Sequence, residues 1–210
     1  MQDRLFLKRI LSVMLMIVVA AHETMAKNDV PLPKRASPRP KTTPGVPHIQ
    51  IGVEPVPEVN AELLRRVYLL PGVEKRSSII SLPGAWGLWL GDSLTLVHPE
   101  VIIAGREFAH IHPDGSLHTS LAPNRADEAV QAGWAIRHPW ASQREGWEGF
   151  VMLYTPQSMQ ELDVTFELIV DSYHFVTGQN IQASDYDSLL SRSSYLGAHT
   201  FSLDEWRRRL

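Results

Sequence analysis

The 210-residue sequence contains no cysteine. A disulfide framework, a thiolate metal site and a cysteine nucleophile are therefore excluded. The sequence also has no excess of basic residues, with 20 lysines and arginines against 23 acidic residues. We therefore do not expect it to bind nucleic acid, because that function needs a basic surface. Familiar catalytic signatures are missing too: there is no Gly-x-Ser-x-Gly elbow, no phosphate-binding glycine loop and no His-Glu-x-x-His motif.

Long hydrophobic runs are scarce. The longest largely apolar run, residues 10–21, spans 12 residues, whereas a membrane-spanning helix needs about 20. Basic residues precede this run, and Ala26 follows it as a small residue suited to cleavage. We therefore expect residues 1–26 to be a signal peptide and the protein to be exported, periplasmic or secreted. The alternative is an uncleaved membrane anchor through residues 10–21.

Proline is concentrated in one segment. Eight of the 15 prolines lie between residues 30 and 57. Because proline fixes φ and removes a hydrogen-bond donor, this pattern predicts an extended linker over residues 27–58 that does not pack. The folded domain is expected over residues 59–178. A polar C-terminal tail, residues 179–210, follows and ends in a short helix.

Hydrophobic periodicity within the domain predicts mixed secondary structure. Helices are expected at residues 57–70, 122–133 and 156–177, with Asn60 and Thr155 capping the first and the last. Strands are expected at residues 78–82, 85–91, 93–97, 100–105, 134–140 and 149–155. Together with a hairpin over residues 106–121, this order predicts an α+β fold. Its antiparallel sheet should pack against the long C-terminal helix and the shorter helices.

The hairpin carries three histidines around a Pro-Asp-Gly turn. A three-residue loop with Gly115 in the left-handed region pairs His112 with Ser116, and therefore His110 with His118. Because side chains alternate along a strand, the three histidines share one face with Phe108. Glu107 is expected on the opposite face.

Three readings of this face stay open. The rings hold the hairpin together, carry out acid–base chemistry, or bind zinc or iron through His110, His112 and His118. Crowded imidazoles disfavour each other's protonation, so at least one histidine pKa should lie below about 6.5. His138, in an Arg-His-Pro turn, is expected to complete the cluster.

The order and spacing of motifs over residues 99–178 resemble the fungal-luciferase-like domain family. The shared pattern is an Arg-Glu-x-Ala-His-x-His strand, a turn with Leu-His, a helix, Gly-Trp, Arg-His-Pro, and a Leu-Tyr-x-Pro strand end before a long helix. The residues that carry it are Arg106, Glu107, Ala109, His110, His112, Leu117, His118, Gly133, Trp134, Arg137, His138, Pro139, Leu153, Tyr154 and Pro156. The family includes the luciferase of luminous mushrooms and bacterial relatives of unassigned function.

The resemblance implies an oxygenase-type enzyme that acts on a small aromatic or pyrone-like lactone substrate. Mushroom members oxygenate a hydroxylated α-pyrone with O2 and have no known organic cofactor, so O2 is the expected co-substrate and no cofactor is expected here. The catalytic candidates are His110, His112, His118, His138 and Arg137, with a histidine as base and Arg137 or a second histidine stabilising the oxyanion. The substrate-binding candidates are Phe108, Trp134, Tyr154 and Ser116.

Three features separate this chain from the mushroom proteins: a tighter hairpin turn, the proline-rich segment and the export signal. Light emission is therefore not expected. The main alternative function is a non-catalytic module of the cell envelope that binds a small ligand or serves in assembly, and a hydrolase is a weaker third. A pocket over the histidines beneath a tryptophan would favour the enzyme, whereas a histidine face open to water would favour the module.

Overall fold

The computed structural model describes residues 31–186. The chain divides into two units, Met1–Pro33 and Lys34–Leu210, and the elements described below belong to the second. The expected signal peptide and the expected helix at the C-terminus lie outside the described residues. Between residues 31 and 186, no helix is both long and apolar enough to span a membrane.

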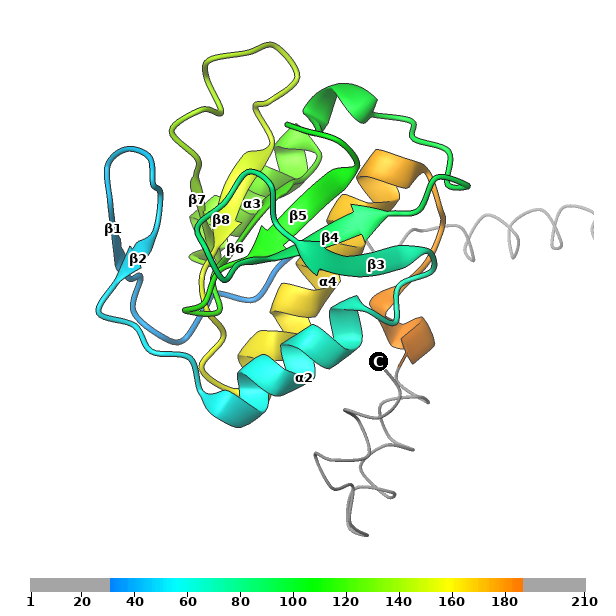
Figure 1. Ribbon diagram of the computed structural model, residues 1–210. Coiled ribbons are helices and arrows are strands. Elements are labelled where there is room, and N and C mark those ends of the chain that lie inside the picture. Colours follow the sequence, from blue (N-terminus) through cyan, green and yellow to red (C-terminus); the bar gives the residue numbers. More distant parts are fainter. Residues whose placement is uncertain (1–30, 187–210) are drawn as a thin grey trace, which may run out of the picture. The chain divides into compact units, whose positions relative to one another are not determined.

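The domain is built on one six-stranded antiparallel sheet with the strand order β3-β4-β5-β6-β8-β7 (Figure 1). The strands are β3 (Val73–Ser77), β4 (Trp86–Leu90), β5 (Glu107–Ile111), β6 (Leu117–Ser120), β7 (Ala135–Arg137) and β8 (Phe150–Leu153). This sheet and its helices confirm the predicted α+β class.

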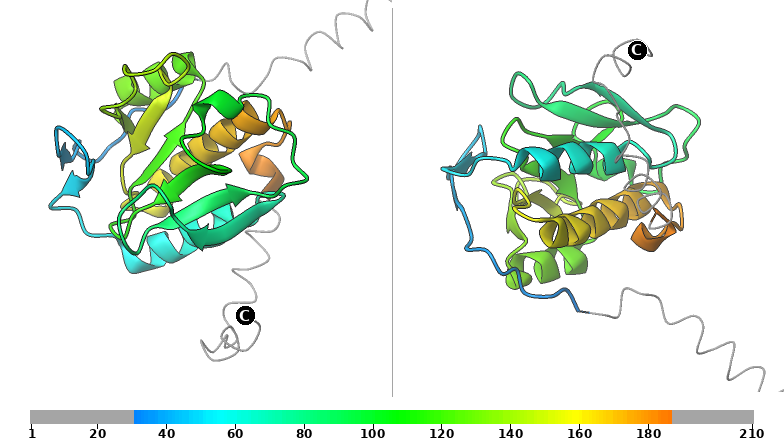
Figure 2. Two further views of the ribbon diagram at one scale, coloured as in Figure 1. Left: turned by 45° about the horizontal axis from the view of Figure 1, so that its top comes forward. Right: turned by 90° about the horizontal axis from the view of Figure 1, so that it is seen from below.

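Two helices, α2 (Pro57–Val67) and α4 (Met159–Thr177), lie side by side on one face of the sheet (Figures 1 and 2). A third helix, α3 (Pro123–Ala132), precedes the edge strand β7. Gly133 ends α3 in the left-handed conformation, as its position in the sequence predicted. The helices leave the other sheet face to loops and to the N-terminal arm, residues 34–56.

Helix α4 covers the centre of the sheet. The Ser158 hydroxyl caps it by accepting a hydrogen bond from the Glu161 N–H, and Gly178 ends it. Phe166, Ile169 and Val170 are buried, as predicted for its inner face. Burial of this apolar stripe against the sheet is the main stabilisation of the helix, because an isolated helix is only marginally stable in water.

The histidine hairpin has the register that its turn predicts. His110 pairs with His118 across β5 and β6, and the His112 N–H donates to the Ser116 carbonyl. Gly115 has φ +81° in the turn. Thr119 on the alternate face reaches Ser172 of α4, with 2.6 Å between their hydroxyl oxygens. The histidines of the hairpin therefore point away from the helices.

Several predicted elements are wrong. Strand β3 was missed because it is a charged, solvent-exposed edge strand without an apolar pattern. The apolar runs at 78–82 and 93–97 are loops, and 100–105 holds only the end of a short 3₁₀ helix, Pro99–Val101. No side chain of the runs 78–82 and 93–97 is fully buried, and Ile79 and Val97 are 60% and 54% exposed.

The predicted helix caps Asn60 and Thr155 are also wrong. Asn60 lies within α2, whose N-cap is Val56 without a side-chain bond. The Thr155 hydroxyl instead donates to the Asp114 carbonyl and accepts from the Gln50 amide. Each side chain can cap a helix, but position along the chain decides whether it does.

The arm packs on the domain, so the prediction of an unpacked linker is wrong for these residues. It contains a two-stranded hairpin, β1 (Lys41–Thr42) with β2 (Gln50–Ile51). Gln50 is 6% exposed and bonds to both the hydroxyl and the backbone N–H of Thr155. Polar groups anchor the arm, and a search for hydrophobic periodicity does not detect such contacts.

Candidate functional site

The three histidines of the hairpin form a buried cluster. Backbone pairing places His110 opposite His118, and their ring centroids lie 5.0 Å apart. His112 follows His110 by two residues and lies 4.7 Å from the His118 ring. Each of the three residues is 5% exposed or less. The predicted shared face is therefore confirmed, with His118 at the centre of the group.

Two further histidines join His118 from other segments. His138, which follows β7, lies 4.6 Å from it between ring centroids, so its predicted place in the cluster is confirmed. His48, from the arm, stacks on it at 5.3 Å. The sequence analysis missed His48. In the sequence, His48 and Gln50 only alternate with isoleucines, and the structure was needed to show that both are buried while Ile51 is 52% exposed.

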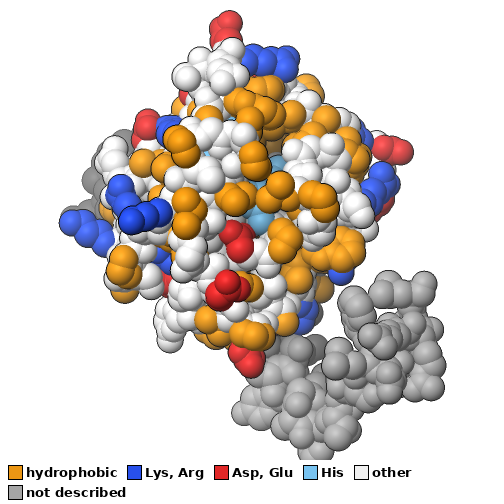
Figure 3. All heavy atoms as spheres, turned by 60° about the vertical axis from the view of Figure 1, so that its left-hand side comes forward, with side chains coloured by type: hydrophobic (Ala, Val, Ile, Leu, Met, Phe, Trp, Pro, Cys, Tyr) orange, Lys and Arg blue, Asp and Glu red, His pale blue; other side chains and the backbone are white. Residues whose placement is uncertain are grey.

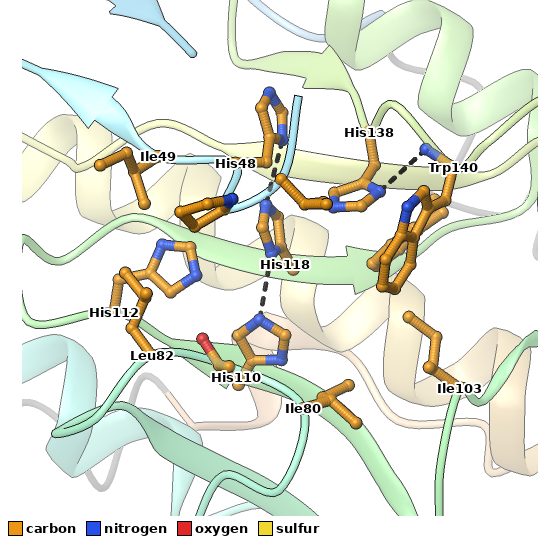
Figure 4. Close-up of a pocket in the computed structure, with 14 residues that line it drawn as sticks. His48, Ile49, Ile80, Leu82, Ile103, His110, His112, His118, His138 and Trp140 are labelled. Atoms are coloured by element: carbon orange, nitrogen blue, oxygen red, sulfur yellow. Dashed lines mark hydrogen bonds between the residues drawn. The ribbon is translucent and has the colours of Figure 1, made fainter. Parts of the chain in front are cut away.

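The five rings line a pocket of about 240 Å³ on the sheet face opposite the helices. Ser81 and apolar side chains form the rest of its wall, and Trp140 closes one side (Figure 4). In a space-filling view, histidine atoms show in a gap among hydrophobic side chains (Figure 3). The lining residues are Val46, Pro47, His48, Ile49, Ile80, Ser81, Leu82, Ile103, His110, His112, His118, His138, Trp140 and Phe150.

A chain of polar contacts runs through the cluster. His110 Nδ1 lies 3.1 Å from the Glu107 carboxylate, and His110 Nε2 lies 3.0 Å from His118 Nδ1. His118 Nε2 lies 3.2 Å from His48 Nδ1 (Figure 4). Because a carboxylate only accepts hydrogen bonds, Glu107 favours a proton on His110 Nδ1. The Nε2 atom of His110 then presents its lone pair to His118.

Two residues of the hairpin turn, Ser116 and Asp114, fix the tautomer of His112. The Ser116 hydroxyl donates to the Asp114 carboxylate at 2.7 Å, so it accepts the hydrogen bond from His112 Nδ1 at 2.9 Å. His112 Nε2 therefore carries the lone pair. Ser116, predicted to bind substrate, instead orients a histidine.

His138 has the opposite tautomer. Its Nδ1 accepts a hydrogen bond from the Trp140 backbone N–H at 3.1 Å. In the neutral ring the proton must then be on Nε2. His138 is thus a hydrogen-bond donor through Nε2, whereas His112 is an acceptor.

Burial keeps the rings of His112, His118 and His138 uncharged. Desolvation first, and the neighbouring imidazoles second, lower the pKa of His112 to about 4 and that of His138 to about 3. The pKa of His118 falls well below 6.5 for the same two reasons. The prediction of at least one lowered histidine pKa is confirmed, although burial contributes more than the crowding on which it was based.

Three of the predicted substrate contacts lie elsewhere. Phe108 packs against Tyr173 of α4, with ring centroids 6.0 Å apart. Trp134 is buried outside the pocket lining, and Tyr154 lies beneath the Arg35 guanidinium. The sequence pattern identified buried aromatic residues but did not show which side of the sheet they face.

Arg137 also lies outside the pocket. Its guanidinium bonds to the Asp127 carboxylate and to the carbonyls of Pro123 and Glu148. Adjacent residues in an extended segment point to opposite sides, so His138 faces the cluster and Arg137 does not. Among the described residues that line the pocket, none is lysine or arginine.

Glu107 was expected on the face opposite the histidines, and this prediction is wrong. The pairing of β4 with β5 shifts between Leu88 and Trp89, so Phe108 is an extra residue in the ladder. Such a bulge changes which face the following side chains occupy. Glu107 consequently reaches His110 and also accepts from the Ser78 hydroxyl at 2.6 Å.

Comparison with known proteins gives one match. Residues 105–172 match the family model described as Luciferase domain. This confirms the resemblance drawn from the motifs: residues 105–172 are similar to the Luciferase domain, and the chain has a buried histidine cluster. No curated protein and no solved structure matches the chain. The matched segment contains four of the five clustered histidines, while His48 precedes it.

Proposed function

We propose that this Luciferase-domain protein is an oxygenase-type enzyme for a small aromatic or lactone substrate. The observation that carries the proposal is the pocket of about 240 Å³, which places uncharged histidines beneath a largely apolar wall. Its volume lies below the roughly 300–1,000 Å³ of sites for drug-sized ligands. A planar substrate of one or two rings, such as a hydroxylated pyrone, suits that volume.

The chemistry follows from the protonation states of the rings. A neutral imidazole of the cluster accepts the proton of the substrate hydroxyl and leaves an enolate, which reacts with O2 as co-substrate. His138 Nε2–H donates to the developing oxyanion, the role that the sequence analysis gave to Arg137 or a second histidine. The apolar wall limits access of water to the oxygenated intermediate. No organic cofactor is required for these steps.

The alternative function is a cell-envelope module that binds a ligand without catalysis. Such a module does not need uncharged histidines lining its pocket. A histidine face open to water would have favoured it. Trp140 and the arm instead cover the histidines, which supports the enzyme. Light emission is not part of the proposal.

Oxygen consumption with a panel of pyrones, flavonoids and catechols tests the proposal. We expect uptake with at least one class, and His118→Ala should lower kcat/KM by about 10²–10⁴-fold, the usual effect of losing acid–base catalysis. His98→Ala is the matched control, because His98 lies outside the cluster and is partly exposed. Full activity in His118→Ala would reject the histidine role, and binding without oxygen uptake would favour the module.

A further inference from the structure

We propose that His110, His112 and His118 bind one divalent transition-metal ion that faces the pocket. One ring nitrogen from each of the three residues lies within 4.8 Å of the others. Three imidazoles with one open position are the donor set of catalytic zinc sites, and imidazole also suits iron and copper. As a catalytic centre this site rests on the proposed function, whereas metal binding itself stands on the geometry.

The closest nitrogen pair is already near the spacing of metal ligands. His110 Nε2 and His118 Nδ1 lie 3.0 Å apart. Two nitrogens bound at about 2.0–2.1 Å in a tetrahedral site lie about 3.3 Å apart. An ion can therefore replace the hydrogen bond between these two rings with little movement of either strand, once the His118 proton moves from Nδ1 to Nε2 and is donated to His48 Nδ1.

Each of the three rings has a partner for its other nitrogen. His110 Nδ1 lies against the Glu107 carboxylate, and His112 Nδ1 donates to Ser116, which bonds to Asp114. His118 Nε2 lies 3.2 Å from His48 Nδ1. Histidines that bind metals almost always donate their second N–H to such a group, which fixes the ring and raises its basicity.

A second set of three, His48, His118 and His138, also has its nitrogens within 4.8 Å. His138 does not suit it. Its Nδ1 accepts the Trp140 N–H, so its Nε2 carries the proton and has no lone pair for a metal. The partner of His138 is a backbone N–H, which can only donate, whereas the partners of His118 are imidazoles, which can donate or accept. His118 can therefore change tautomer to bind a metal and His138 cannot, which favours the hairpin set and leaves His48 and His138 as non-ligand groups of the pocket.

The open position faces the cavity. All three proposed ligands line the pocket, and the described part of its lining offers no carboxylate to complete the coordination. A water molecule or an oxygen atom of the substrate would take the fourth position. Bound there, the ion would orient a substrate enolate and stabilise its charge, acting as a Lewis acid.

The test is metal binding by the full chain without a polyhistidine tag. After removal of metal with a chelator, the protein is titrated with Zn²⁺ by calorimetry and with Co²⁺ by visible absorption. We expect one ion per chain and the intense visible bands of four-coordinate Co²⁺. Absence of stoichiometric uptake would overturn the site.

Variants locate the ion. His112→Ala should abolish stoichiometric binding, and Glu107→Gln, which keeps the shape of the side chain, should weaken it by about 10–100-fold. Circular dichroism verifies that each variant is folded. His138→Ala should bind like the wild type, with His98→Ala as the control outside the cluster. Loss of binding in His138→Ala with retention in His112→Ala would overturn the assignment.

The two proposals fail separately. Stoichiometric Zn²⁺ binding without oxygen uptake on any substrate would support the metal site and reject the oxygenase proposal. Oxygen uptake that is unchanged in the metal-free protein and in Glu107→Gln would overturn the metal centre as part of catalysis while leaving the enzyme.

Discussion

His118 is the residue on which the site depends, because its ring contacts four other histidines. It is 5% exposed and lies within 5.3 Å of His48, His110, His112 and His138 between ring centroids. A charge on any of these rings would raise the energy of a charge on the others. His112, His118 and His138 therefore act as neutral donors and acceptors, and the groups around them fix the directions of their hydrogen bonds.

The role of His138 gives a prediction at this scale. Removing its Nε2–H in His138→Ala should lower kcat by about 10²–10³-fold, as does loss of one oxyanion donor in other enzymes. KM should change little, since the donor acts mainly on charge that develops during the reaction. Steady-state oxygen uptake measures both. An unchanged kcat with a raised KM would show that His138 only binds substrate.

At the scale of elements, the arm is held on the domain by a buried ion pair. Arg35 and Glu161, at the start of α4, lie 2.9 Å apart with side chains 2% and 7% exposed. Arg35 also donates to the Thr155 carbonyl. Because the same arm carries His48, the stability of this contact bears directly on whether the pocket is complete.

Glu161 gives a prediction for pH. Burial raises its pKa, but hydrogen bonds from Ser37, Gln157 and Arg35 and the charge of Arg35 outweigh burial, so the pKa is lowered from 4.5. The stabilisation is therefore complete above about pH 4.5 and is lost as pH falls through the folded-state pKa. Glu161→Gln should cost about 3–5 kcal/mol at pH 7, the usual effect of breaking a buried pair.

Urea unfolding of the wild type and Glu161→Gln at several pH values between 7 and 3 measures this contribution. The difference in unfolding free energy between the two proteins should shrink below pH 4.5. Glu54→Gln serves as the control, since Glu54 is an exposed carboxylate of the arm. A difference that stays constant down to pH 3 would contradict the assignment to this carboxylate.

At the scale of the whole molecule, the pocket extends beyond the matched domain. The Luciferase-domain match covers residues 105–172. Pocket residues 46–49 and 80–82 precede it. The arm thus supplies one wall of the cavity and its fifth histidine.

The N-terminal sequence gives a prediction at the same scale. The basic start, the 12-residue apolar run and Ala26 predict an exported protein whose mature chain begins at Lys27. Intact mass of the exported form measures the start directly. A mass that begins at His22 would identify Ala21 as the cleavage site, and retention of residues 1–26 in a membrane fraction would favour the anchor.

The sequence by itself determined the hairpin and most of the cluster. Pro-Asp-Gly admits few turn geometries, and the two-residue alternation of strands then places His110, His112 and His118 on one face. The register is a local property, so it can be read from neighbouring residues. The same holds for α3 and α4, whose ends are marked by Gly133 and Gly178.

Only the tertiary structure decided what surrounds that face. His48 lies 70 residues from His118 in sequence, and the bulge that turns Glu107 toward His110 depends on pairing with β4. Phe108 and Arg137 were wrongly predicted to lie in the pocket, because the hydrophobicity or charge of a residue does not show which side of the sheet it faces. Local patterns fix conformation over a few residues, whereas contacts between distant segments form when the sheet is assembled, and these contacts close the pocket.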